Sequence, residues 1–111
     1  MDIVWHDDIE RDLKRLNGFP APRESLEAWQ RLFCSKGLKE TPAIDSYPGF
    51  GDAKIYKGRV VPLRENTGKS KGYRVIFQIS NVNYCKIIIF SRHGIYKTEQ
   101  ELINIVKQRI G

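Results

Sequence analysis

The sequence contains few of the residues that build metal centres and disulfide frameworks. Its 111 residues include two cysteines, Cys34 and Cys85, two histidines and no CxxC pair. Single cysteines on separate elements predict small core side chains in a reducing compartment. So few thiol and imidazole groups also argue against a structural zinc site. We therefore expect neither a metal ion nor another cofactor.

Long apolar runs are also lacking. The longest, Ile87–Phe90, is far too short to cross a membrane, and the acidic amino terminus is unlike the start of a secretory signal. A Gly-Lys-Ser sequence at 68–70 resembles the end of a phosphate-binding loop, but Leu63 stands where that motif needs glycine. The sequence thus predicts a cytoplasmic protein with no membrane contact and no bound nucleotide.

Acidic residues become scarce in the second half of the chain. Residues 1–52 hold seven basic and ten acidic side chains, whereas residues 53–111 hold twelve basic and three acidic ones. The stretch 53–97 has ten Lys or Arg and a single acid, Glu65, yet it is also the most strand-like part. A sheet that presents cations predicts a face for nucleic acid or for an acidic protein. A solvated basic surface is the simpler alternative.

Hydrophobic periodicity predicts one α+β domain over residues 1–111. A strand at 2–6 precedes two helices, the first marked by Ile9, Leu13 and Leu16 and the second running over about 23–36. Residues 38–52 show no period and are predicted to form a loop. Strands are expected at 53–61, 73–80 and 84–91, before a helix opened by the capping box at 98–101.

The predicted order of elements is therefore β-α-α-β-β-β-α. Three of the strands follow one another with short connections, which indicates antiparallel pairing. We expect a two-layer fold, with a largely antiparallel four-stranded sheet and the helices packed on one face.

Several cations recur on the predicted strands. Lys57 and Arg59 share a face by their two-residue spacing, and Arg74 lies opposite the side of its strand assigned to the core. Neighbouring strands lie about 5 Å apart, so cations on the helix-free face would reach a single phosphate. This pattern predicts an anion-binding face on the sheet.

The run IYKGRVVPLRENTGKSKGYRVIFQI, the apolar strand after it and the final SRHGIYKTEQELINIVKQRIG resemble the RelE/ParE superfamily of bacterial and archaeal toxins. The pattern is closest to RelE and HigB. The resemblance covers residues 53–111 well and residues 1–36 only in layout. It implies a small messenger-RNA endonuclease, commonly acting on the ribosome and neutralised by an antitoxin protein. It also implies metal-free chemistry, in which the 2′-hydroxyl attacks the adjacent phosphate and leaves a 2′,3′-cyclic phosphate.

The resemblance assigns roles to individual residues. Arg74 matches the arginine of the family's GYR motif and Arg92 the basic residue after the fourth strand, and both are expected to stabilise phosphate. Tyr96 takes the place of an aromatic acid or base. A lysine or tyrosine crowded by cations has a lowered pKa, so Lys57 and Tyr96 are both candidate bases. His93 departs from the RelE pattern, and either acid–base work or a solvated loop position fits it. Further RNA contacts are expected from Lys54, Arg59, Lys69, Lys71 and Lys97.

Two other functions fit the same sequence. One is a ParE-type poison of DNA gyrase, which keeps the fold without the nuclease residues; the set of Arg74, Arg92 and Tyr96 favours the nuclease. The other is a noncatalytic RNA-binding or ribosome-associated module, which needs the same cations. A partner antitoxin is expected to lay an acidic or amphipathic segment over the basic face or the terminal helix.

Overall fold

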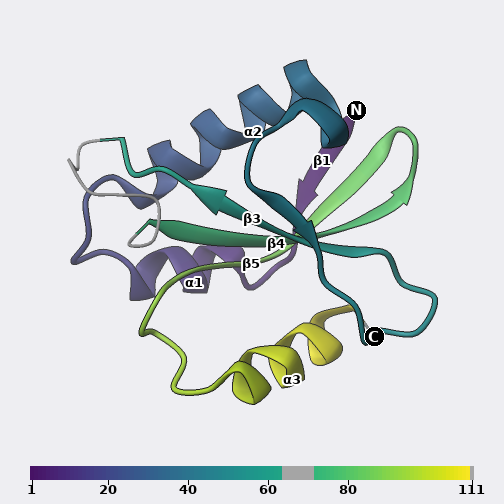
Figure 1. The fold of residues 1–111 in the computed structure, drawn as a ribbon. Helices are drawn as coiled ribbons and strands as arrows, with labels where there is room; N and C mark the ends of the chain where they lie inside the picture. Colours follow the sequence, from purple (N-terminus) through teal and green to yellow (C-terminus); the bar gives the residue numbers. More distant parts are fainter. Residues whose placement is uncertain (64–71, 111) are drawn as a thin grey trace.

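The computed structural model describes residues 1–63 and 72–110 (Figure 1). These residues form a sheet of five strands and three helices. In chain order the elements are β1 (Asp2–Trp5), α1 (Ile9–Arg15), α2 (Pro22–Glu40), β2 (Ile44–Ser46), β3 (Ile55–Val60), β4 (Tyr73–Asn81), β5 (Tyr84–Arg92) and α3 (Glu99–Ile110). The α+β class predicted from the sequence is confirmed.

The sheet differs from the prediction in its number of strands and in their directions. Its order is β1-β5-β4-β3-β2, with β1 parallel to β5 and every other pair antiparallel. It is therefore a five-stranded mixed sheet, and the expected four-stranded sheet is wrong. The extra strand, β2, lies inside the segment 38–52 that was predicted as a loop. Three residues are too few for a period-two pattern to be visible in the sequence.

Helices cover both faces of the sheet, so the predicted two-layer arrangement is also wrong. α1 and α2 pack on one face, where Trp29 and Phe33 contact Phe77. α3 packs on the other face through Leu102, which belongs to the same apolar cluster as Ile76. Figure 1 shows α2 and α3 on opposite sides of the strands. The physical reason lies in β4 and β5, whose central residues are apolar on both faces and need cover on both.

The second helix continues past its predicted end. Gly37 was expected to stop the helix, but α2 extends to Glu40. Gly37 has a φ of 78° and non-helical backbone, so the chain kinks there and then resumes. A positive φ of this kind favours glycine, because a Cβ atom would be strained.

A bulge in β5 changes which side chains face which way. Ile76 pairs with Ile89 while the next residue of β4, Phe77, pairs with Ile87, so Ile88 is an additional residue in β5. Both Ile88 and Ile89 join the apolar cluster under α3. A bulge of one residue reverses the alternation of all side chains that follow it.

A buried ion pair holds this bulged part of β5. The guanidinium of Arg109, near the end of α3, donates to the Asp12 carboxylate of α1 at 2.7 and 3.0 Å. Asp12 also accepts the backbone N–H of Phe90, and Arg109 donates to the carbonyl of Ile88. β1 pairs with β5 only as far as Ile87, so these side chains bind backbone groups just beyond that pairing. The pair therefore joins α1, α3 and β5.

Asp12→Ala should lower the free energy of unfolding by about 3–5 kcal/mol, because it leaves a charged guanidinium buried without its partner. Urea unfolding followed by circular dichroism measures the change. The control is Glu10→Ala on the same helix, whose ion pair with Arg23 is exposed, and it should leave the unfolding free energy almost unchanged. Equal losses in the two variants would contradict a central role for Asp12.

The two cysteines differ in their surroundings. Cys85 is fully buried, and burial raises the pKa of its thiol to about 12. Cys34 is exposed on α2, so the expectation that both cysteines are core residues is wrong for Cys34.

Within the part of the chain that the structure describes, no helix has both the length and the apolar character to cross a membrane.

Candidate nucleic-acid interface

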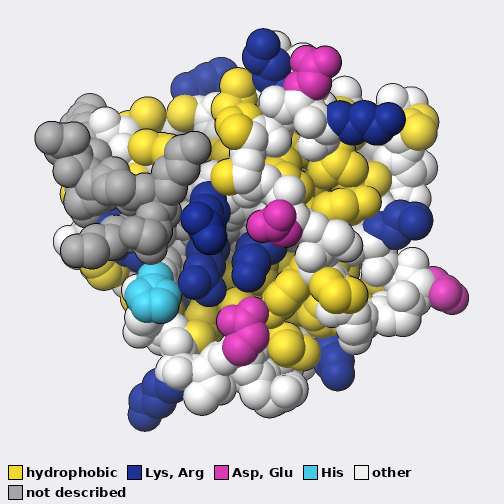
Figure 2. All heavy atoms as spheres, viewed as in Figure 1, with side chains coloured by type: hydrophobic (Ala, Val, Ile, Leu, Met, Phe, Trp, Pro, Cys, Tyr) yellow, Lys and Arg dark blue, Asp and Glu magenta, His cyan; other side chains and the backbone are white. Residues whose placement is uncertain are grey.

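Two adjacent strands place three cations on one face of the sheet. Arg59 of β3 lies directly opposite Arg74 of β4, and Lys57 lies opposite Ile76. Directly paired residues project from the same face of a sheet. Ile76 packs beneath α3, so all three cations belong to the α3 side. We call Lys57, Arg59 and Arg74 the basic patch; Figure 2 shows Lys and Arg side chains gathered on this side of the molecule.

The pairing of Arg59 with Arg74 opposes the usual rule for sheets. Like charges directly across two strands are destabilising. The backbone N–H of Arg59 donates to Ala43, away from β4, which makes this a non-hydrogen-bonded pair with Cα atoms about 4.5 Å apart, the closer of the two types. An anion bound between the two guanidinium groups would remove the repulsion, so the arrangement favours phosphate or another oxyanion.

A polar cavity lies beside the patch, between β4, the end of β5 and the start of α3. Its volume is about 320 Å³, and Arg74, His93 and Glu99 are among the residues that line it. Arg74 Nη2 lies 3.4 Å from His93 Nδ1, and His93 is exposed. A guanidinium, an imidazole and a carboxylate thus converge on one hollow, which is the set of groups needed to bind a phosphate and move protons around it.

A residue of the segment 38–52, Tyr47, contacts both the basic patch and a residue that lines the cavity. The Tyr47 hydroxyl donates to Glu99 Oε1 at 2.5 Å, and Lys57 Nζ lies 5.2 Å from the centre of the Tyr47 ring. Burial, followed by the hydrogen bond to Glu99, raises the pKa of Tyr47 above its ordinary value. Asp45 pairs with Lys57 across β2 and β3. The sequence gives no local signal for the contact between Tyr47 and Glu99, because 52 positions separate the two residues.

Arg92 faces away from the patch. It pairs with Tyr73, whose ring belongs to the core under α1 and α2, whereas Ser91 pairs with Arg74. The Arg92 guanidinium lies 4.5 Å from the ring centre of Phe19 and 5.3 Å from that of Tyr73. It is 9% exposed and the bulge at Ile88 accounts for its orientation. Arg92 still contributes to the lining of the polar cavity together with Arg74, but its guanidinium stacks on Phe19 and Tyr73.

Tyr96 does not have the environment expected of a base. It packs against the apolar cluster under α3 and lines the polar cavity. Its hydroxyl accepts a hydrogen bond from Arg15 at 3.4 Å. Burial, together with the charge of Asp12, raises its pKa despite the nearby arginines. The expected lowering by surrounding cations is wrong here, because removal from water outweighs them.

The remaining predicted RNA contacts are scattered. Lys54 is exposed just before β3. Its position in the alternation of side chains is opposite to that of Lys57 and Arg59. Lys97 is exposed and lines the polar cavity, and its backbone N–H donates to Glu101. Lys69 and Lys71 lie outside the described residues.

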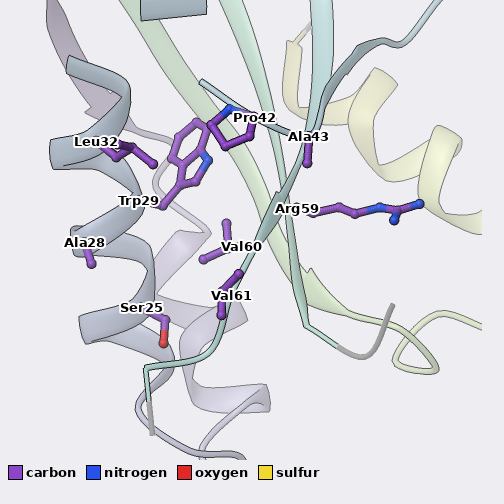
Figure 3. A pocket seen from close by; sticks show the side chains of 9 residues that line it. All are labelled: Ser25, Ala28, Trp29, Leu32, Pro42, Ala43, Arg59, Val60 and Val61. Carbon is purple, nitrogen blue, oxygen red and sulfur yellow. The ribbon is translucent and has the colours of Figure 1, made fainter. Parts of the chain in front are cut away.

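A second hollow, of about 190 Å³, lies on the other side of the sheet between α2 and the end of β3. Its lining is mainly apolar and includes Trp29, Leu32 and Val61 (Figure 3). Arg59 borders this hollow, but Figure 3 shows its side chain extending away from it toward α3. The apolar hollow therefore lacks the charge that an anion would need, and the polar cavity has it.

Comparisons of the chain with protein-family models, with curated proteins and with solved structures found no match. The resemblance to the RelE/ParE superfamily rests on the sequence pattern of residues 53–111. The basic patch and its cavity provide a separate, geometric basis for a functional proposal.

If the patch binds a polyanion, Arg59→Gln should weaken binding of a single-stranded RNA and reduce the slope of log K against log salt by about 0.7. Fluorescence anisotropy over a series of salt concentrations measures both quantities. Arg31→Gln is the matched control, because it removes the same charge from an exposed position on α2. Equal losses in the two variants would mean that RNA is attracted by net charge and not by the patch.

Proposed function

We propose that this protein is a metal-independent endoribonuclease that cleaves messenger RNA, as the toxin of a type II toxin–antitoxin system. The observation that carries the proposal is the cross-strand pair Arg59–Arg74 beside His93 and the polar cavity. The proposed reaction is attack of a 2′-hydroxyl on the adjacent phosphate, which yields a 2′,3′-cyclic phosphate and a free 5′-hydroxyl. The proposed setting is the cytoplasm, on messenger RNA engaged by the ribosome.

The proposal assigns different tasks to the cations. Negative charge develops on the phosphorus oxygens as the 2′-oxygen attacks, and preorganised guanidinium groups stabilise it best when no metal does so. Arg74 is the group proposed for this task, because it belongs to the basic patch and also lines the cavity. Arg59 and Lys57 continue the patch along β3 and are proposed to hold the neighbouring backbone phosphates.

His93 is proposed to move a proton in this reaction. It lies within hydrogen-bond distance of Arg74 and lines the cavity, and imidazole is suited to proton transfer near neutral pH. Tyr96 also lines the cavity, but its raised pKa keeps the phenol protonated at neutral pH, so it can give a proton and not take one.

A noncatalytic RNA-binding module remains the second candidate, and the surroundings of two residues favour it. Arg92 and Tyr96 are two of the five residues that the family resemblance or the sequence assigned to catalysis. Arg92 stacks on Phe19, and burial raises the pKa of Tyr96. A site reduced to Lys57, Arg74 and His93 would still bind RNA through its charge. The gyrase-poison alternative has no structural observation in its favour.

Arg74→Ala should lower the rate of RNA cleavage roughly 100-fold or more, the usual effect of removing a group that stabilises charge in the transition state. The assay uses a defined messenger RNA with EDTA, with and without translating ribosomes, and identifies the ends of the products. Arg31→Ala is the control for loss of one positive charge.

Arg92→Ala should act mainly by lowering thermal stability, because the Arg92 guanidinium stacks on the rings of Phe19 and Tyr73.

Cleavage by the wild type that leaves cyclic-phosphate ends, lost in Arg74→Ala, would support the nuclease. RNA binding with steep salt dependence and no cleavage in either setting would replace it with the binding module. Cleavage of equal rate in wild type and Arg74→Ala would remove the patch from the mechanism.

Expression of this chain alone should arrest growth of a bacterial host, and Arg74→Ala should relieve the arrest. Colony counts after induction measure the effect, with immunoblotting to confirm equal amounts of soluble protein. Normal growth at a high soluble yield of the wild type would contradict the toxin proposal. The proposed antitoxin is an acidic or amphipathic segment that covers the basic patch or α3.

A further inference from the structure

The proposed cleavage needs a group that takes the proton from the attacking 2′-hydroxyl. The raised pKa values of Tyr47 and Tyr96 exclude both phenols from this task at neutral pH. Carboxylates are deprotonated bases at neutral pH, and two of them border the patch, Asp45 and Glu99. Figure 2 shows acidic side chains on two sides of the central Lys and Arg side chains.

Glu99 is the carboxylate that lines the same cavity as Arg74 and His93. It is the first residue of α3, and Leu102, one turn later, is buried and anchors the helix to the sheet. One oxygen, Oε1, accepts the hydroxyl of Tyr47. Among the described residues no hydrogen bond engages Oε2, so this oxygen is open to a substrate hydroxyl.

Capping of the helix N–H groups does not account for Glu99. Acidic side chains in the first turn stabilise a helix by capping its N–H groups and through its dipole. Here the capping is carried out by other residues, since the Glu101 N–H donates to Thr98 Oγ1 and the Lys97 N–H donates to Glu101 Oε2, each at 3.1 Å. Glu99 instead turns toward Tyr47 and the cavity.

We propose that Glu99 is the general base of this site and that Tyr47 is a positioning residue that holds its carboxylate. This inference rests on the proposed ribonuclease function and adds a catalytic residue to it. The charged and titratable residues that line the cavity with Glu99 or contact it through Tyr47 are Lys57, Arg74, Arg92, His93, Tyr96 and Lys97.

The reaction balances with these groups alone. Glu99 takes the 2′-hydroxyl proton as the bond between the 2′-oxygen and phosphorus forms. The bond between phosphorus and the 5′-oxygen breaks, and His93 gives a proton to that oxygen. Arg74 stabilises the phosphorus oxygens in between. Exchange of protons with water returns Glu99 and His93 to their starting states, with no oxidant, reductant or metal.

The Glu99→Gln variant tests the role of Glu99 as general base. Its amide oxygen still accepts a hydrogen bond from the Tyr47 hydroxyl, but the amide does not take up a proton. We expect kcat/KM for RNA cleavage to fall roughly 100-fold or more, the scale of general base catalysis, while RNA affinity stays near that of the wild type. The acidic limb of the pH–rate profile should disappear as well. Tyr47→Phe should retain that limb with a smaller loss of rate, because the carboxylate remains but is less well held.

The matched control is Glu101→Gln, which makes the same change two positions along α3, where the carboxylate accepts the Lys97 N–H. Its kcat/KM should stay near that of the wild type, with the acidic limb intact. Thermal unfolding of all variants identifies any loss of fold.

The outcomes separate this inference from the function on which it rests. A wild type that cleaves RNA, together with a folded Glu99→Gln variant that keeps its rate and acidic limb, would overturn the role of Glu99 alone. A wild type that binds RNA without cleaving it would overturn the ribonuclease and the base together.

Discussion

The buried pair of Asp12 with Arg109 fixes the part of the sheet on which the candidate site depends. It binds the backbone of β5 at Ile88 and Phe90, on either side of Ile89 in the bulged segment. Because the bulge reverses the alternation after it, it turns Ser91 toward Arg74 and sends the Arg92 guanidinium to the opposite face. A buried ion pair contributes little net stability compared with apolar residues of the same volume, but this one provides hydrogen-bond partners for backbone groups within the bulged segment. The register of β5 therefore decides which of its side chains lies beside Arg74 of the basic patch.

The basic patch contains a pair of like charges that lowers stability, and the rest of the fold offsets this cost. Arg59 and Arg74 face each other across two strands, an arrangement that lowers stability. Apolar layers on both faces of β4 and β5 offset the cost, since side chains such as Ile76 and Phe77 are fully buried. Departures from local rules that have no structural benefit tend to occur at functional sites. The neighbouring cavity has His93 and Glu99 in its lining, which is consistent with the site that we propose.

The side chains of β3 face a different environment on each side of the sheet. Side chains alternate along β3, so Val60 faces the apolar hollow under α2 while Arg59 extends toward α3 (Figure 3). Tyr47 then closes the charged side by linking the segment after β2 to Glu99 on α3. Cations and a polar cavity lined by His93 and Glu99 thus lie together on one side of the sheet, separate from the apolar hollow on the other.

The amino-acid sequence by itself determined the α+β class, the approximate positions of the helices and of β3, β4 and β5, and the common face of Lys57 and Arg59. Each of these depends on local periodicity or on turn and cap residues. Tertiary structure decided the five-stranded mixed sheet, the cover on both faces, the reversal of Arg92 and the raised pKa of Tyr96. It also brought Tyr47 to Glu99. Strand pairing, a single-residue bulge and burial from water are long-range properties, and no window of the sequence contains both partners.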